Sequence, residues 1–147
     1  MADNSSRKVL IENTDAQLLD GVTEILRGLK STLFDVTHYQ MVFQYKKKHA
    51  SILYPRSLVV SQDFILLCDE DLTSCDAKIS LVDSNRLKNI FQVRTEENPL
   101  HLTIMFKSKA VFGPGKKWRL IFETRTAATR TREECKRACA EIGNNDV

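Results

Sequence analysis

Seven short apolar segments follow one another after about residue 40, each rich in β-branched and aromatic residues. Turn-like or charged stretches separate them, with no helical pattern between. Leu102, Ile104 and Phe106 alternate so that they share one face of a strand. Pro55 cannot donate to a β-ladder, which predicts an edge position or a bulge there. Strands in direct succession predict an antiparallel barrel or sandwich. Its strands are QMVFQYKKK, SILYPRSLVVSQ, DFILLCDEDL, AKISLV, NIFQVRT, LHLTIMFKS and WRLIFETRT.

An amphipathic helix is predicted before the strands, within residues 14–34. Thr14 and Gln17 form a capping-box start, and four apolar side chains recur at helical spacing. Gly21 and Gly28 each weaken the helix by roughly 1 kcal/mol relative to alanine, so it needs to dock. We expect it from about 15 to 30, with its stripe buried on the barrel; the alternative is contact with another copy or a partner. The stripe consists of Leu18, Val22, Ile25 and Leu29.

A second amphipathic helix is predicted near the C-terminus, in TRTREECKRACAEIGNNDV. Thr131 and Glu134 form a capping-box start, and Gly143 suits a helix C-cap. Its small-residue face consists of Cys135, Ala138, Cys139 and Ile142. The polar residues 1–13 predict a flexible tail, and residues 40–143 form one predicted domain.

Composition narrows the class of protein. The 147 residues suit one domain, and a net charge of +3 is too balanced for a dedicated nucleic-acid binder. No apolar run approaches the roughly 20 residues that span a bilayer, and the N-terminus lacks a signal peptide's apolar core. We therefore expect a cytosolic or nuclear protein, with the cytoplasm as the favoured location, and reduced cysteines. The cysteine spacings, C-x6-C and C-x3-C, fit zinc poorly, so core packing is expected and no metal site.

Enzyme signatures are missing from the sequence. There is no nucleophile elbow, no phosphate-cradling glycine loop and no Ser-His-Asp or His-Cys pattern with usable context. The GPG at residues 113–115 is typical of a turn. We therefore expect a non-enzymatic protein without a cofactor.

The order of seven strands and a closing helix resembles the pleckstrin-homology (PH) superfold. The segment PRSLVVSQDFILLC is similar to the second-to-third-strand hairpin of PH domains and of the PH-like tail domains of class I myosins. The resemblance covers about residues 40–143. It implies a mainly β (α+β) fold: a PH-like seven-stranded antiparallel barrel or sandwich capped by a C-terminal helix, here with an extra N-terminal helix.

The same resemblance implies a candidate anion site. Phosphoinositide-binding members carry a basic residue near the first loop, then a basic-x-arginine pair on the second strand. Lys47 or Lys48 matches the first and Arg56 the last, but Tyr54 replaces the remaining basic residue. The PH layout gathers the loops after strands one, three and six at one end, with Val111 and Phe112 at a loop tip. The candidate lipid-binding residues are Lys46, Lys47, Lys48, Arg56, Lys107, Lys109, Lys116 and Lys117, and the acids that oppose them are Asp69, Glu70, Asp71 and Asp76.

The expected function is that of an adaptor or targeting module that binds a signalling or cytoskeletal protein. The incomplete phosphoinositide motif and the mixed charge favour a protein partner, for which the C-terminal helix offers Arg132, Lys136 and Arg137. The alternative is weak binding of anionic phospholipids or phosphoinositides through the basic loops, which would make the protein peripheral to a membrane. Nucleic acid is not expected as a partner, because basic residues do not interleave with aromatic ones.

Overall fold

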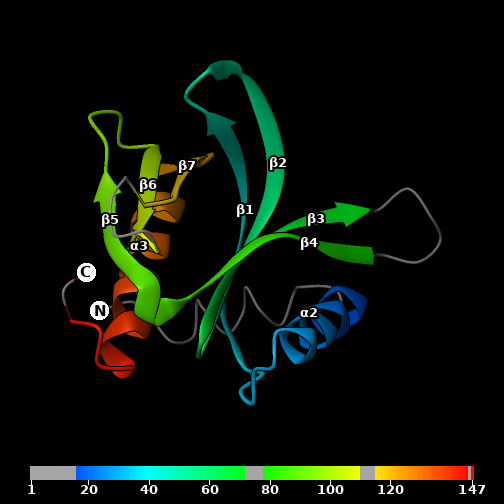
Figure 1. The fold of residues 1–147 in the computed structure, drawn as a ribbon. Coiled ribbons are helices and arrows are strands. Elements are labelled where there is room, and N and C mark those ends of the chain that lie inside the picture. Colours follow the sequence, from blue (N-terminus) through cyan, green and yellow to red (C-terminus); the bar gives the residue numbers. More distant parts are fainter. Residues whose placement is uncertain (1–15, 72–77, 110–114, 146) are drawn as a thin grey trace.

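The computed structural model describes residues 16–71, 78–109, 115–145 and 147. One antiparallel seven-stranded sheet, in the order β4-β3-β2-β1-β7-β6-β5, curls around a core (Figure 1). One helix precedes the strands and another follows them, as predicted. The elements are α2 (Ala16–Gly28), β1 (Val36–Lys46), β2 (His49–Ser61), β3 (Phe64–Asp71), β4 (Lys78–Arg86), the 3-10 turn η1 (Leu87–Asn89), β5 (Ile90–Thr95), β6 (His101–Phe106), β7 (Lys117–Ile121) and α3 (Arg125–Glu141).

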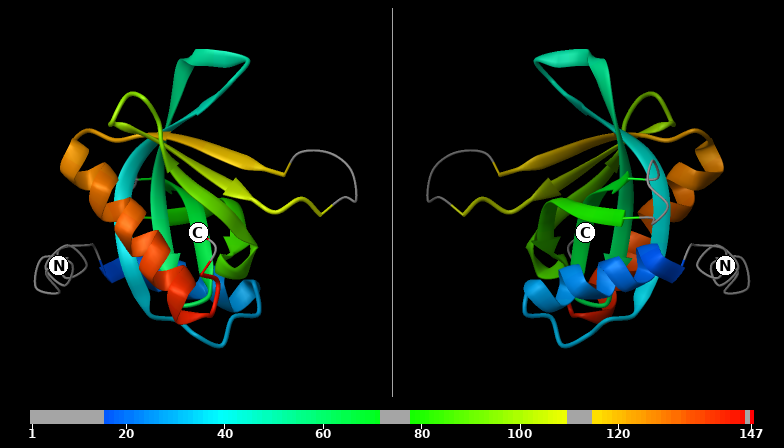
Figure 2. Two further views of the ribbon diagram at one scale, coloured as in Figure 1. Left: turned by 90° about the vertical axis from the view of Figure 1, so that its left-hand side faces the viewer. Right: turned by 90° about the vertical axis from the view of Figure 1, so that its right-hand side faces the viewer.

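The inner face of the sheet and helix α3 share the larger hydrophobic core. Trp118 and Phe122 are its largest fully buried side chains, and the Trp118 ring meets Phe106 edge to face at 4.7 Å between centroids. Helix α3 contacts β1, β2, β5 and β6 and closes one side of the curled sheet (Figure 2). It contributes Ala128, Cys135, Ala138 and Cys139 to this core.

Helix α2 covers the outer face of the sheet and forms a second core. Val22 and Leu26 are fully buried against Val59, Phe64 and Leu66. The predicted burial of the α2 stripe on the barrel is therefore confirmed.

Strand β3 is buried on both faces. Ile65 and Leu67 point into the larger core, whereas Phe64, Leu66 and Cys68 lie in the core under α2. A strand covered on both sides gains from an apolar side chain at every position. This double burial explains why the segment FILLC does not alternate.

The structure corrects two predicted boundaries. Strand β1 begins at Val36 rather than near residue 40. Helix α3 begins at Arg125, with Thr124 as its N-cap accepting a hydrogen bond from the Ala127 backbone N–H at 3.0 Å. Thr131 is therefore not a capping residue: it is buried inside the helix, and its Oγ1 lies 2.8 Å from His38 Nε2. In the sequence, a buried threonine one turn before an acidic residue has the same pattern as a capping box.

The position of Pro55 agrees with the edge character that was predicted for it. It pairs with Phe43 of β1, while the ladder between β2 and β3 begins only at Ser57. Among the described residues, β2 therefore has a ladder partner on only one side at Pro55.

The three described cysteines are buried in the two cores, as predicted; Cys75 lies outside the described residues. Burial, reinforced by nearby Glu70 and Asp69, raises the pKa of Cys68 to about 12. Burial also raises the pKa of Cys139, to about 11. Both thiols therefore stay protonated at neutral pH and pack as small apolar groups.

Gly21 supplies a test of how α2 docks. A Cβ at Gly21 would lie 2.4 Å from Ile79 Cγ2 of β4, whereas a Cβ at Gly28 would meet nothing within 4 Å. We expect Gly21→Ala to lower the free energy of unfolding, because overpacking costs about 1–3 kcal/mol. Gly28→Ala should raise it by roughly 0.4–1 kcal/mol, because alanine restricts the unfolded chain. Urea unfolding of both variants measures the difference, and equal stabilisation by both would contradict this docking.

Candidate binding site between two diverging hairpins

Two β-hairpins diverge from one point of the sheet. The β1–β2 pairing continues to Lys46 and His49, and the β3–β4 pairing continues to Asp71 and Lys78. The ladder between β2 and β3 is much shorter and ends at Ser57 opposite Cys68. Beyond this point the two hairpins separate (Figure 1). The outer parts of β2 and β3 thus flank an opening.

The predicted lysine cluster occupies the end of the β1–β2 hairpin. Lys47 and Lys48 form a two-residue turn between Lys46 and His49, and all four residues are exposed. The Lys46 ammonium lies 5.9 Å from the centroid of the Tyr54 ring. The cluster is therefore a projecting, solvent-exposed basic turn.

Arg56, the residue matched to the phosphoinositide motif, is held by neighbouring side chains. Its Nη1 lies 2.7 Å from Asp69 Oδ1, and its Nε donates to Gln44 Oε1 at 3.1 Å. The guanidinium also lies 5.3 Å from the centroid of the Tyr54 ring. With its side chain only 14% exposed, Arg56 is largely neutralised within the fold, which weighs against a role as phosphate ligand.

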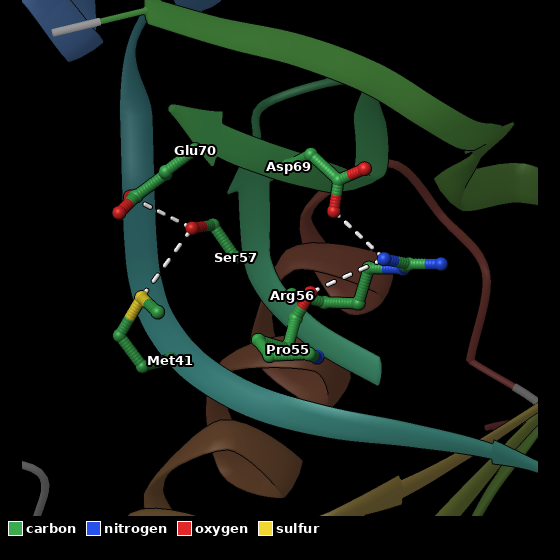
Figure 3. Close-up of a pocket in the computed structure, with 6 residues that line it drawn as sticks. All are labelled: Met41, Pro55, Arg56, Ser57, Asp69 and Glu70. Atoms are coloured by element: carbon green, nitrogen blue, oxygen red, sulfur yellow. Dashed lines mark hydrogen bonds and ion pairs between the residues drawn. The ribbon is translucent and has the colours of Figure 1, made fainter. Parts of the chain in front are cut away.

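A pocket of about 260 Å³ lies where the hairpins separate. Figure 3 shows Glu70, Ser57 and Met41 on one side and Asp69 and Arg56 on the other. This pocket was not predicted from the sequence, where the acids at the end of the third strand were expected only to oppose the basic loops. The lining residues are Met41, Pro55, Arg56, Ser57, Asp69 and Glu70.

Glu70 organises one wall of the pocket. Its Oε1 accepts a hydrogen bond from Ser57 Oγ at 2.7 Å and another from the Tyr39 hydroxyl. Burial, together with the Glu70 carboxylate, raises the pKa of Tyr39 well above its usual range. The tyrosine therefore remains a protonated donor at neutral pH, and the described hydrogen bonds of Glu70 come from neutral hydroxyls.

The second predicted group of lysines flanks the ends of β6 and β7. Lys107 Nζ donates to the Lys88 carbonyl at 3.0 Å. Lys116 Nζ lies 2.8 Å from Asp83 Oδ1, and Trp118 Nε1 donates to the other oxygen of that carboxylate at 2.8 Å. In the described part of the chain, the exposed residues Lys109 and Lys117 form no ion pair. Val111, Phe112 and Asp76 lie outside the described residues.

The structure does not bring the two lysine groups together. The β1–β2 turn stands at the top of the molecule, whereas the ends of β6 and β7 point to the side (Figure 2). The predicted single basic rim is therefore two separate basic surfaces.

The face of α3 proposed for protein contact is less open than expected. Of Arg132, Glu133, Lys136 and Arg137, only Glu133 is exposed and the other three are half-buried. Arg137 pairs with Glu134 at 2.9 Å and with Glu141. The reason is the phase of the helix, whose buried stripe at residues 131, 134, 135, 138 and 139 lies directly beside them.

Two further observations concern other classes of function. No group of three or more His, Cys, Asp or Glu side chains that could hold a metal ion occurs among the described residues. None of the helices that the structure describes is long and apolar enough to cross a membrane.

Comparison by sequence gives no relative: no family model matches the chain, and no curated protein matches it significantly. Comparison by structure does. The DH/PH fragment of PDZRHOGEF in complex with human RhoA matches 94% of this chain and 40% of that chain, with a TM-score of 0.65 and 14% identity. The linker-DH/PH domains of p115-RhoGEF match 95% of this chain and 38% of that chain, with a TM-score of 0.60 and 12% identity. This chain thus spans well under half of those proteins' structures.

The Slm1-PH domain in complex with inositol 4-phosphate matches 71% of this chain and 97% of that chain, with a TM-score of 0.56 and 12% identity. Residues from β1 to the end make up about three quarters of the present chain. The RhoGEF matches therefore extend into the region of α2, whereas the Slm1-PH match needs only the barrel and α3. This chain has the pleckstrin-homology-like fold, with one helix docked on the outside of its barrel.

Proposed function

We propose that this protein is a non-enzymatic adaptor module of the cytoplasm that recognises a partner protein. Similar structures support a binding role of either kind: the PDZRHOGEF fragment is in a complex with RhoA, and Slm1-PH is in complex with inositol 4-phosphate. The choice between protein and head group therefore depends on the side chains of this chain.

The ion pair between Arg56 and Asp69 is the observation that favours a protein partner over a phosphorylated head group. A phosphate ligand would have to compete with a carboxylate 2.7 Å from the Arg56 guanidinium. Glu70 adds a second negative charge to the same pocket, and Tyr54 replaces a basic residue of the motif. Anionic ligands are repelled by such a pocket, whereas protein surfaces offer apolar and cationic groups that suit it.

A second candidate function is unselective contact with an anionic membrane through the end of the β1–β2 hairpin. The supporting observation is that two apolar side chains, Ile52 and Leu53, are each 46% exposed close to the three turn lysines. Each basic residue near an anionic bilayer contributes about 1 kcal/mol, and partial insertion of the apolar pair adds burial. This contact requires no participation by Arg56.

Asp69→Asn tests the proposed role of the ion pair. We expect the parent protein to bind inositol 4-phosphate weakly and the variant to bind it roughly tenfold more tightly, because a charge-assisted hydrogen bond is worth about 1.5–3 kcal/mol. Since Asp69 is half-exposed, its loss should cost only about 1 kcal/mol of stability or less. Isothermal titration calorimetry measures the affinities. Glu97→Gln, which removes a similar charge far from Arg56, should leave them unchanged.

Tight, head-group-selective binding by the parent would overturn the protein-first proposal. The comparison uses sedimentation with phosphatidylserine vesicles and with phosphoinositide vesicles of matched charge. We expect the parent to sediment equally, and weakly, with both.

The hairpin contact is tested by replacing Lys46, Lys47 and Lys48 together with glutamate. Sedimentation with phosphatidylserine vesicles should be abolished, and that of the parent should fall as salt rises. Stability should change by less than about 0.5 kcal/mol, because the turn is exposed. The matched control replaces Lys107, Lys109 and Lys117 with glutamate, giving the same change in charge on the other basic surface. If the control loses binding as fully as the turn variant, net charge rather than the hairpin is responsible.

A further inference from the structure

Apolar surface borders the pocket between the hairpins. Met41, which lines it, is 46% exposed, as is Leu53 farther along β2. Successive odd-numbered residues of β2 lie on one face, so Leu53, Pro55 and Ser57 share a side, and Ser57 is opposite Met41. The pocket thus opens onto a strip of apolar side chains along one face of the hairpin.

The backbone beside this strip has an open edge. Among the described residues, His49, Tyr54, Pro55 and Arg56 of β2 pair with β1 only, because the ladder to β3 stops at Ser57. An unpaired strand edge can accept an extended segment of another protein through main-chain hydrogen bonds. Pro55 cannot donate, so main-chain donors for such a segment come from the residues between the turn and Pro55 whose N–H groups face this edge.

The charge of the pocket selects the side chain that can enter it. Two carboxylates, Asp69 and Glu70, and one guanidinium, Arg56, line the pocket. The Asp69 side chain remains 53% exposed despite its ion pair, and Glu70 accepts from the hydroxyls of Tyr39 and Ser57. An excess of negative charge over an apolar rim suits a side chain with a methylene stem and a cationic end.

We infer that the pocket binds an arginine or lysine side chain of an extended segment from a partner protein, with an apolar residue two positions later lying on Leu53. The stem of the basic residue packs on Met41 and Pro55, and its cationic end lies between Asp69 and Glu70. This inference rests on the proposed function as a protein-binding module and names the chemistry that it recognises.

The test uses the full chain and two nonapeptides, acetylated and amidated, built from serine, threonine and glycine. One has arginine at its centre and valine two positions later; the other has glutamate in place of arginine. Titration followed by ¹H–¹⁵N NMR should give saturable shifts of the Met41, Ser57 and Glu70 amides with the arginine peptide only. Glu70→Gln should weaken binding roughly tenfold, the loss expected for one charge-assisted hydrogen bond. Glu97→Gln should have no effect.

The Glu70→Gln variant should fold normally, because the amide oxygen still accepts from Tyr39 and Ser57; its melting temperature checks this. Shifts that are equal for the two peptides, absent, or located at β5 and α3 would overturn the inference. So would shifts that appear on concentrating the protein alone, since these would identify a second copy as the occupant. If an isolated partner protein binds the parent and Glu70→Gln equally, the adaptor function stands and this pocket is not its site.

Discussion

The burial of β3 on both faces is the constraint on which the rest of the structure depends. Its inward side chains join the core closed by α3, and its outward side chains form the floor on which α2 docks. The strand can be covered in this way only as far as Cys68, after which three acidic residues follow. Carboxylates cannot be buried without partners. The pairing with β2 ends at the same point, and the two hairpins separate there.

The pocket and the polar contacts that line it lie where the hairpins separate. Asp69 pairs with Arg56 on one side of the opening, and Glu70 accepts from Ser57 and Tyr39 on the other. These contacts satisfy the acids that the end of the apolar run exposes. They also change what Arg56 can do, because an arginine already paired with a carboxylate offers little attraction to a phosphate.

The arrangement of the hairpins, rather than the overall composition, determines where basic and acidic side chains gather on the surface. The turn of the β1–β2 hairpin carries lysines without acids, whereas the neighbouring β3 carries adjacent acids. The lysines around β6 and β7 are partly engaged, with Lys116 on Asp83 and Lys107 on a backbone carbonyl. A net charge of +3 therefore conceals local surfaces of opposite sign, and surfaces of opposite sign suit a protein partner better than a uniformly anionic membrane.

The sequence by itself determined the strand count, the two helices, the burial of the α2 stripe and the edge character at Pro55, because periodicity and proline chemistry act locally. Only the tertiary structure decided which residues meet. The partner of Arg56 lies thirteen positions away on another strand, and Thr131 is buried against His38 inside α3, whose N-cap is Thr124. The pocket could not be predicted from the sequence either, because it lies where the β2–β3 ladder ends while the ladders within the two hairpins continue. Local sequence patterns determine the helices and strands, whereas the lengths of the ladders between strands determine where the pocket lies.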